Sequence, residues 1–149
     1  MASDASTRRS ATVFAGDQDL RQEAQRLAAG GLALGLVVFA APRRAARLLG
    51  LPAAHVNGSA LLMARLYAIR EAARGVQLIG EARSADGPRH GTALLNASID
   101  TSDAVMFAVL AVREPELRRA STLLGLFAGA VSALWVRYAR HVRAAGHRY

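Results

Sequence analysis

Residues 59–80 read SALLMARLYAIREAARGVQLIG, and residues 92–112 read TALLNASIDTSDAVMFAVLAV. Both stretches are apolar over about the 20 residues that a helix needs to cross a bilayer core, yet both carry charges near their middle. These charged residues are Arg65, Arg70, Glu71 and Arg74 in the first stretch and Asp100 and Asp103 in the second. Ionisable groups at such a depth are costly and are commonly functional. The two stretches therefore predict membrane helices that hold opposite charges between them.

Two further apolar stretches flank this pair, at residues 27–41 (LAAGGLALGLVVFAA) and 122–136 (TLLGLFAGAVSALWV). The first is shorter than about 20 residues, but Gln25 and Arg26 extend it because long polar side chains can snorkel to the interface. Pro42 is expected to end this helix, since the residue before a proline disfavours helical geometry. The pattern predicts an all-α protein, a four-helix transmembrane bundle.

The chain divides into three predicted parts. Residues 1–16 are small, polar and without periodicity, which is typical of a disordered terminus. Residues 17–140 are expected to form the membrane domain, and residues 141–149 a basic tail. Within the domain, residues 42–52 place three arginines beside three leucines, so we expect a short amphipathic segment at the headgroup boundary after the first helix. Asn57 is expected to cap the second helix.

The composition fits a basic membrane protein. The 149 residues suit a single domain, 52% of them are hydrophobic, and the mean hydropathy is +0.18. The net charge of +8 comes from 19 arginines without any lysine, and it suits anionic lipid headgroups or nucleic acid as a partner. The chain has no cysteine, which excludes disulfides, thiol redox chemistry and cysteine-ligated metals.

The arginines also predict an orientation. Ten of them lie near the two termini and in the 81–91 loop, which share one side of the bundle, and six lie in the opposite loops. An excess of positive charge marks the cytoplasmic side, so both termini are predicted in the cytoplasm and the protein in the inner (plasma) membrane. Trp135 and Tyr138, beside Arg137 and Arg140, are expected to form an interfacial aromatic belt.

Helical spacing places polar side chains on one face of each charged helix. The two stripes are Met63, Tyr67, Arg70 and Arg74, with Glu71 on the adjoining face, and Asn96, Asp100, Asp103 and Phe107. If the helices form an antiparallel hairpin, Arg70 lies level with Asp103, and Asp100 lies within ~3 Å along the axis of either central arginine. The sequence therefore predicts a polar seam between the two helices.

This seam has two interpretations. In the functional one it lines a pocket, where arginine clamps an anionic or carbonyl group and carboxylates transfer protons. In the structural one the charges pair only to hold the helices in register. The functional interpretation assigns ligand binding to Arg65, Tyr67, Arg70, Arg74 and Asn96, and catalysis to Glu71, Asp100 and Asp103.

A third interpretation removes the seam. Residues 98–103, SIDTSD, are rich in side chains that cap helix N-termini. The helix would then begin at Asp103 and Asp100 would lie in a loop. The remaining helix would be too short to cross a bilayer, so the bundle would have one span fewer.

Other motifs add little. Gly31 with Gly35, and Gly125 with Gly129, form G-x-x-x-G pairs that allow close helix packing. No Gly-rich phosphate loop or common hydrolase motif occurs, so no cofactor is predicted. We expect the four histidines to lie in solvated loops or in the tail and not to form a metal site. They are His55, His90, His141 and His147.

Three segments carry a resemblance to a known family: PRRAARLLGLP (42–52), RLYAIREAARGVQLIG (65–80) and IDTSDA (99–104). They resemble small, uncharacterised bacterial four-helix membrane proteins of DoxX-like type. Those proteins show a proline after helix one, an LGLP-like turn, an R-x-Y-x-x-R-[D/E]-x-x-x-G helix and a D-x-x-D helix. The matching positions are Pro42, Leu49 to Pro52, Arg65, Tyr67, Arg70, Glu71, Gly75, Asp100 and Asp103. The resemblance covers residues 27–136 and implies a four-helix membrane fold without an agreed reaction. Some relatives are linked to thiol or quinone chemistry, and the lack of cysteine argues against the thiol role.

Three functions follow as hypotheses. The first is an integral membrane protein, surrounded by membrane lipids, that binds a lipophilic small molecule at the seam; isomerisation or cyclisation is the reaction expected if it is also an enzyme, which the sequence leaves open. The second is a non-catalytic membrane subunit or assembly factor with structural ion pairs, and a homo-oligomer is compatible with either. The third is a soluble, basic nucleic-acid-binding protein. It is disfavoured because the arginines lie at segment ends and only 5% of residues are aromatic, so no nucleic-acid partner is expected.

Overall fold

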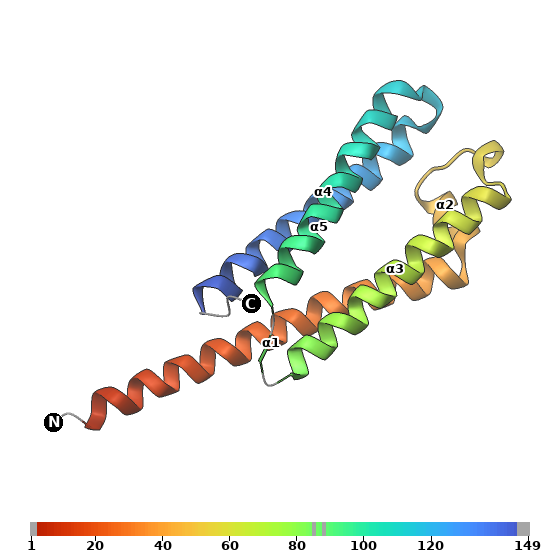
Figure 1. Cartoon of the computed structure of the whole chain (residues 1–149). Coiled ribbons are helices and arrows are strands. Elements are labelled where there is room, and N and C mark those ends of the chain that lie inside the picture. The colour runs from red at the N-terminus through yellow and green to blue at the C-terminus, as the bar shows by residue number, and fades with distance from the viewer. Residues whose placement is uncertain (1–2, 85, 88, 146–149) are drawn as a thin grey trace.

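The computed structural model describes residues 3–84, 86–87 and 89–145, with side chains described from residue 18 onward. Every regular element in this part of the chain is helical, which confirms the all-α class (Figure 1). In chain order the elements are α1 (Ser3–Ala40), α2 (Pro42–Leu48), the 3-10 turn η1 (Ala53–His55), α3 (Gly58–Arg83), α4 (His90–Arg113), the 3-10 turn η2 (Pro115–Leu117) and α5 (Arg118–Ala144).

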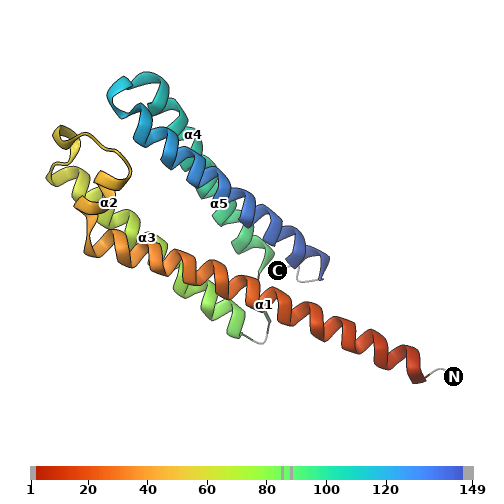
Figure 2. The same cartoon turned by 180° about the vertical axis from the view of Figure 1, so that it is seen from behind.

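The four long helices form two antiparallel pairs. α1 packs along α3, and α4 packs along α5 (Figures 1 and 2). Between the pairs, the backbones of α1 and α5 approach only locally, and those of α3 and α4 stay farther apart than the helices within a pair. The sequence predicts α3 and α4 as a hairpin in direct contact. The structure instead joins them through long side chains, because each has another helix as its close neighbour.

Glycines set the closest approach within the α1–α3 pair. A methyl group on Gly35 would lie 2.7 Å from the carbonyl oxygen of Ala68. One on Gly75 would lie 2.7 Å from Cγ of Leu32. Both distances are shorter than carbon atoms tolerate, so these helices can pack this closely only because glycine occupies both positions.

The α4–α5 pair is held by small and hydroxyl side chains. The hydroxyl groups of Ser132 and Thr101 lie 2.7 Å apart, and Ser132 also donates to the carbonyl oxygen of Ala97 at 3.1 Å. Gly125 faces α4, with 3.4 Å between a methyl group placed there and its nearest neighbour. Gly129, its predicted G-x-x-x-G partner, has no such neighbour within 4 Å among the described residues.

The buried core is small and rich in alanine. Tyr138, Leu78 and Val142 are its largest fully buried side chains. Trp135 is 5% exposed and packs edge to face on Tyr138, with ring centroids 6.1 Å apart. The predicted interfacial belt is therefore wrong. Both rings belong to the buried core cluster that α5 shares with side chains of α1, α3 and α4, while the arginines beside them are exposed.

Among the described residues, three segments are long and apolar enough to cross a membrane: Gln18–Ala40, His90–Arg113 and Pro115–Ala144. α3 has 26 residues, but the charges along it keep it out of this group. The sequence predicts four spans, so length and composition support three of them directly.

Local signals set several helix boundaries. α1 ends at Ala40, and Pro42 begins α2. The predicted cap is confirmed, because the Asn57 side chain accepts a 3.0 Å hydrogen bond from the backbone N–H of Ala60. At the other end of the chain α5 continues to Ala144, into the predicted tail, of which residues 146–149 lie outside the described residues.

Two expected boundaries differ from the structure. α1 begins at Ser3, within the segment predicted to be disordered, where several alanines and the lack of proline favour a continuing helix. α4 runs without a break from His90 to Arg113. Asp100 and Asp103 therefore lie inside a helix, and the interpretation that begins the helix at Asp103 is wrong.

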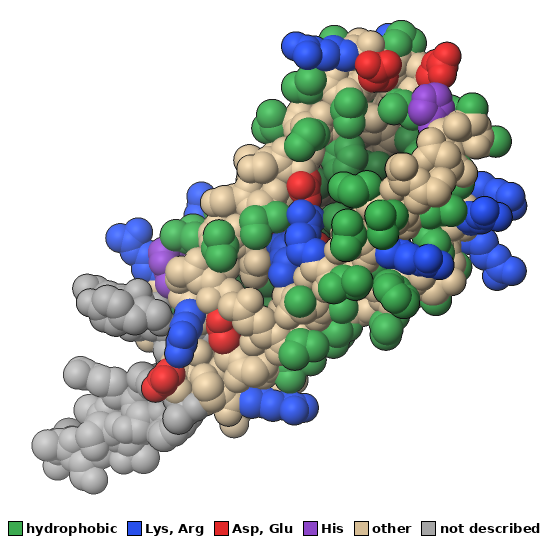
Figure 3. All heavy atoms as spheres, turned by 45° about the vertical axis from the view of Figure 1, so that its right-hand side comes forward, with side chains coloured by type: hydrophobic (Ala, Val, Ile, Leu, Met, Phe, Trp, Pro, Cys, Tyr) green, Lys and Arg blue, Asp and Glu red, His purple; other side chains and the backbone are tan. Residues whose placement is uncertain are grey.

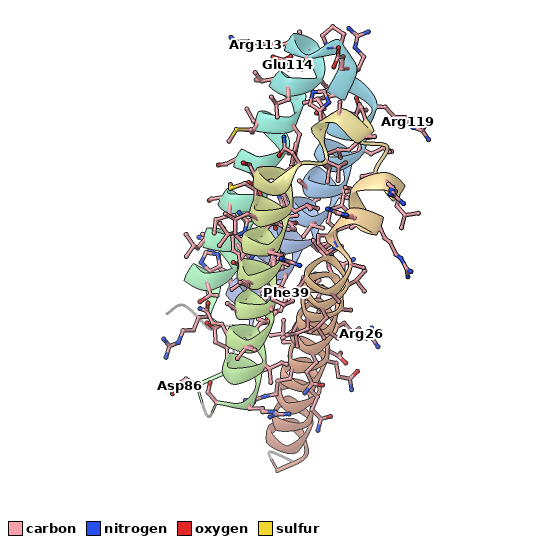
Figure 4. The ribbon with its side chains drawn as sticks, turned by 90° about the vertical axis from the view of Figure 1, so that its right-hand side faces the viewer. Arg26, Phe39, Asp86, Arg113, Glu114 and Arg119 are labelled. Atoms are coloured by element: carbon pink, nitrogen blue, oxygen red, sulfur yellow. The ribbon has the colours of Figure 1, made fainter. Side chains whose placement is uncertain are left out.

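Charged residues mark both ends of the molecule. Arg113, Glu114 and Arg119 lie toward the end formed by η2 and α2, and Asp86 lies at the opposite end (Figure 4). The start of α1, the loop between α3 and α4 and the end of α5 share this opposite end (Figures 1 and 2). The loops and termini are thus distributed as the predicted topology requires.

Candidate functional site

Near its middle, α3 turns the charged Glu71 and Arg74 inward and several apolar side chains outward. Glu71 and Arg74 are 7% and 9% exposed, whereas Leu66, Ile69 and Val76 of the same helix are at least 50% exposed. Figure 3 shows acidic and basic side chains gathered midway along the molecule, with apolar side chains above and on both sides. Water would favour the reverse arrangement. We define the polar seam as Arg70, Glu71 and Arg74 of α3 with Asn96, Asp100 and Asp103 of α4.

Arg74 is the centre of the polar seam. Its two Nη atoms donate to the two carboxylate oxygens of Asp100 at 2.9 and 2.8 Å, which is a bidentate pair. Nη1 also donates to Oε1 of Glu71 at 2.9 Å. Nε donates to Oδ1 of Asn96 at 3.0 Å, and Nη2 to the Asn96 carbonyl oxygen at 3.5 Å. A guanidinium has five N–H groups, so these five bonds use all of them.

Arg70 forms a second and more accessible part of the seam. Its Nη2 donates to Oδ2 of Asp103 at 2.6 Å, and its Nε donates to Oε1 of Glu71 at 3.3 Å. The guanidinium carbon lies 4.7 Å from the ring centre of Tyr67, within range of a cation–π interaction. The predicted register is confirmed, because Arg70 meets Asp103 and Arg74 meets Asp100 across antiparallel helices.

A cavity of about 540 Å³ lies beside the seam, between the two helix pairs. Its volume falls within the range of about 300–1,000 Å³ that is usual for small-molecule sites. Apolar side chains of α1 and α5 form most of its wall, among them Leu27, Leu34, Val37, Phe127, Val131 and Leu134. Val37 and Phe127 are also exposed at the surface. The cavity therefore opens between α1 and α5, on an apolar face.

The polar side chains on the cavity wall come mainly from the seam. They are Tyr67, Glu71, Arg74 and Asp100, with Arg26 of α1 in addition. Trp135 completes this wall, and its ring centre lies 5.6 Å from the guanidinium carbon of Arg74. One end of the cavity is therefore polar and aromatic, and the rest is apolar.

The polar seam has a formal net charge of −1, because its two arginines contribute +2 and its three carboxylates contribute −3. The carboxylates differ in which of their oxygens already accept hydrogen bonds. Arg74 holds both oxygens of Asp100. Within the described part of the chain, every hydrogen bond to Glu71 ends on Oε1. Two carboxylate oxygens of the seam therefore accept no hydrogen bond from the described residues, Oε2 of Glu71 and Oδ1 of Asp103, and of these two residues Glu71 lines the cavity.

The structure brings seven of the eight predicted site residues together. Four of them line the cavity: Tyr67, Glu71, Arg74 and Asp100. Three belong to the seam outside the cavity wall: Arg70, Asn96 and Asp103. Arg65 is not at the seam. Its guanidinium carbon lies 5.9 Å from the ring centre of Phe39, on α1.

Sequence reasoning missed Trp135 as a site residue. Its neighbours Arg137 and Arg140 suggest an interfacial role, but the helical period gives a better signal. Ala128, Ser132, Trp135 and Ala139 recur at intervals of four and three, and all four are buried. A run of small residues on one face of an apolar helix marks a packed face, and a tryptophan within it is expected to point inward.

Among the residues that the structure describes, no three His, Asp or Glu side chains are grouped as a metal site. Comparisons with protein-family models, with curated proteins and with solved structures found no match. The resemblance to DoxX-like membrane proteins therefore stays a prediction that rests on the short motifs alone.

Proposed function

We propose that this chain is an integral membrane protein that binds a lipophilic small molecule in the cavity beside the polar seam. The observation that carries the proposal is the inverted α3, with buried Glu71 and Arg74 and an exposed row of Leu66, Ile69 and Val76. In a bilayer the outer row would contact lipid, and the charges would face the bundle interior, where ionisable residues of membrane helices are normally found.

The same inversion supports α3 as a fourth span. Its charges exclude it by composition, but the two innermost arginines are paired with carboxylates of α4. Pairing lowers the cost of burying them. We therefore propose a four-helix membrane bundle with both termini on the cytoplasmic side of the inner membrane, as the arginine distribution predicts.

The position of the cavity supports a ligand that arrives through the lipid. Its opening lies between α1 and α5, where Val37 is 61% and Phe127 47% exposed. Both helices contain a segment that is apolar enough to cross a membrane. A lipophilic molecule dissolved in the bilayer would reach the polar wall without passing through water.

If the protein is an enzyme, Glu71 is the carboxylate best placed to transfer a proton. It lines the cavity, and its Oε2 is open, whereas Asp100 is held by Arg74 through both oxygens. Asp103 lies outside the cavity wall, so it would act by positioning Arg70. An isomerase or cyclase that moves a proton on a bound lipophilic substrate would use this arrangement.

One observation favours the second hypothesis, a non-catalytic membrane subunit. Arg74 uses all five donors within the protein, as expected for a group whose task is to join α3 to α4. In that case the cavity would be empty or filled by lipid, and loss of Glu71 would change protein abundance without changing ligand binding.

The absence of cysteine permits a direct test of the fourth span. Ala54→Cys and Asp86→Cys place single thiols at exposed positions beyond the two ends of α3. In intact cells an impermeant maleimide is expected to label Ala54→Cys and to label Asp86→Cys only after lysis. Labelling of both from one side, or release of the protein by alkaline carbonate, would contradict the proposal.

A further inference from the structure

We infer that the cavity accepts a lipophilic cation: one apolar chain that ends in a protonated amine, with the amine against Glu71. The inference rests on the proposed function and names the class of ligand. Four features support it: the charge of the seam, the donors of Arg74, the open acceptor of Glu71 and the apolar character of the remaining wall.

The net charge of the seam favours a positive partner. The five side chains of the seam that carry a formal charge sum to −1, and two of them, Arg70 and Asp103, are 36% and 24% exposed. Arg26 also lines the cavity, but it is exposed, so solvent screens its charge. An uncompensated charge in a medium of low dielectric constant is costly, and an ammonium group at Glu71 would bring the formal sum of the seam to zero.

Arg74 has no free N–H group to donate to an anionic ligand. It is the cavity's buried cation, and each of its five N–H groups already bonds to Glu71, Asn96 or Asp100. An anionic ligand would have to displace the bidentate Asp100 pair. The sequence-based expectation that arginine clamps an anionic or carbonyl group is therefore not what this geometry favours.

The open group on the wall is an acceptor. Oε2 of Glu71 receives no hydrogen bond from the described residues, and Glu71 is 7% exposed. A charge-assisted hydrogen bond from an ammonium group is of the stronger kind. Tyr67 lies on the same wall, and its ring already carries the Arg70 guanidinium at 4.7 Å.

The rest of the cavity fits the apolar chain. Leu27, Leu34, Val131 and Leu134 are among the residues that line it. Arg26 is the remaining charged residue of the wall; it is exposed and lies on the outer side of α1 (Figure 4). A cavity of about 540 Å³ suits a single chain with a small head group.

The single tryptophan supplies the readout, because Trp135 lies on the cavity wall. The proposed pose puts the head group near Trp135, so the bromine must lie near the head group and not at the chain end. We would place the protein in phosphatidylcholine nanodiscs and titrate three amphiphiles that differ only in the head group: 6-bromododecylammonium, 6-bromododecanol and 6-bromododecanoate. Bromine quenches tryptophan on contact. We expect saturable quenching by the ammonium compound at about tenfold lower concentration than by the alcohol, and weaker binding still for the carboxylate.

Two matched variants locate the preference. Glu71→Gln keeps the shape of the side chain and removes its charge, so the tenfold preference for ammonium over alcohol should disappear. Glu116→Gln removes a carboxylate that is 78% exposed in η2, and it should leave the titration unchanged. Saturable displacement by unbrominated dodecylammonium separates binding in the cavity from general partitioning into the nanodisc.

The outcomes separate the two proposals. Absence of saturable quenching by all three compounds contradicts ligand binding itself, and with it the proposed function. Saturable binding in which the alcohol or the carboxylate equals the ammonium compound leaves the proposed function standing and overturns the cation. Tighter binding of the neutral alcohol would mean that a proton, and not a bound cation, neutralises the negative charge of the seam. If Glu71→Gln fails to insert into the membrane, the order in which the wild-type protein binds the three compounds tests the preference for a cation.

One further arm identifies the source of the amine. Phosphatidylethanolamine carries a primary ammonium on a two-chain lipid, whereas a free long-chain amine carries it on one chain. Exchange of part of the phosphatidylcholine for phosphatidylethanolamine should raise the ammonium concentration needed for quenching if the natural ligand is the lipid head group. An unchanged titration would favour a free amine.

Discussion

The contacts within each helix pair differ in kind from those between the pairs. Within the α1–α3 pair, Gly35 and Gly75 allow backbones to touch. Between the pairs, α3 and α4 meet through Arg70 and Arg74, whose long side chains reach aspartates on the facing helix. Small residues leave no space, whereas long side chains hold helices apart and leave room beside them. The cavity lies where the second kind of contact is used.

The largest expected effect is the loss of the central partner between the pairs. Asp100→Ala leaves Arg74 buried with part of its hydrogen bonding lost, and breaking a buried pair on one side commonly costs about 3–5 kcal/mol. We expect a large fall in thermal stability of the detergent-purified protein, or loss of the protein from the membrane fraction. Asp86→Asn, in the exposed loop, is the control.

A combined replacement sharpens this prediction. Arg74→Met with Asp100→Leu and Glu71→Gln removes the three charges that meet at Arg74 and keeps the approximate volume, and such exchanges of a buried ionic group are often neutral. The triple variant should therefore recover most of the stability that Asp100→Ala loses. A triple variant no more stable than the single one would mean that the seam contributes by more than ionic pairing.

The next effect tests the contact within a pair. Gly35→Ala places a methyl group 2.7 Å from a carbonyl oxygen of α3, and overpacking of this kind costs about 1–3 kcal/mol. Gly129→Ala meets no neighbour within 4 Å in the described structure and should be neutral or slightly stabilising. Equal melting temperatures for the two variants would show that the α1–α3 contact is looser than described.

A smaller effect is expected in the α4–α5 pair. Ser132→Ala removes the contact with Thr101 and the hydrogen bond to the Ala97 carbonyl. Interhelical hydrogen bonds of membrane proteins average about 0.6 kcal/mol, so the melting temperature should fall by only a little. Ser98→Ala is the control, because Ser98 bonds only within its own helix, to the carbonyl oxygen of Leu94. A loss as large as that of Gly35→Ala would contradict the ordering proposed here.

The smallest effect belongs to the exposed contact between α1 and α5. Glu23 accepts from Arg137 at 2.8 Å and lies 3.0 Å from Nδ1 of His141. Arg137 is 61% exposed, and exposed pairs contribute at most about 1 kcal/mol. Glu23→Gln should therefore change stability little, and the change should shrink further as salt is added. A loss comparable to that of Asp100→Ala would reverse the contrast between the seam and the surface.

The sequence predicts the features that depend on nearby residues. Pro42 and Asn57 act on their own helices, so their effects could be expected in advance. The register of the seam could also be predicted, because spacing along two antiparallel helices fixes which side chains lie level. Arg70 opposite Asp103 is the clearest example.

The choice of neighbours could not be predicted in the same way. Adjacency along the chain allows α3 to pack on either α1 or α4, and the close fit at Gly35 and Gly75 selects α1. The period of small residues on α5 marks the buried face that holds Trp135, but it does not say which helices cover that face. The walls of the cavity depend on how side chains of separate segments fit together, and no periodicity within one segment contains that information.

If α3 spans the membrane as proposed, the division of charge between α3 and α4 has a consequence for insertion. α3 leaves the ribosome before α4, and at that moment Arg74 has Glu71 as its seam partner, while Asp100 is still to be made. A translocon that handled α3 alone would have to release two poorly compensated arginines into lipid. The helix is thus expected to wait at the translocon until α4 arrives, so that the two helices partition into the bilayer as one unit.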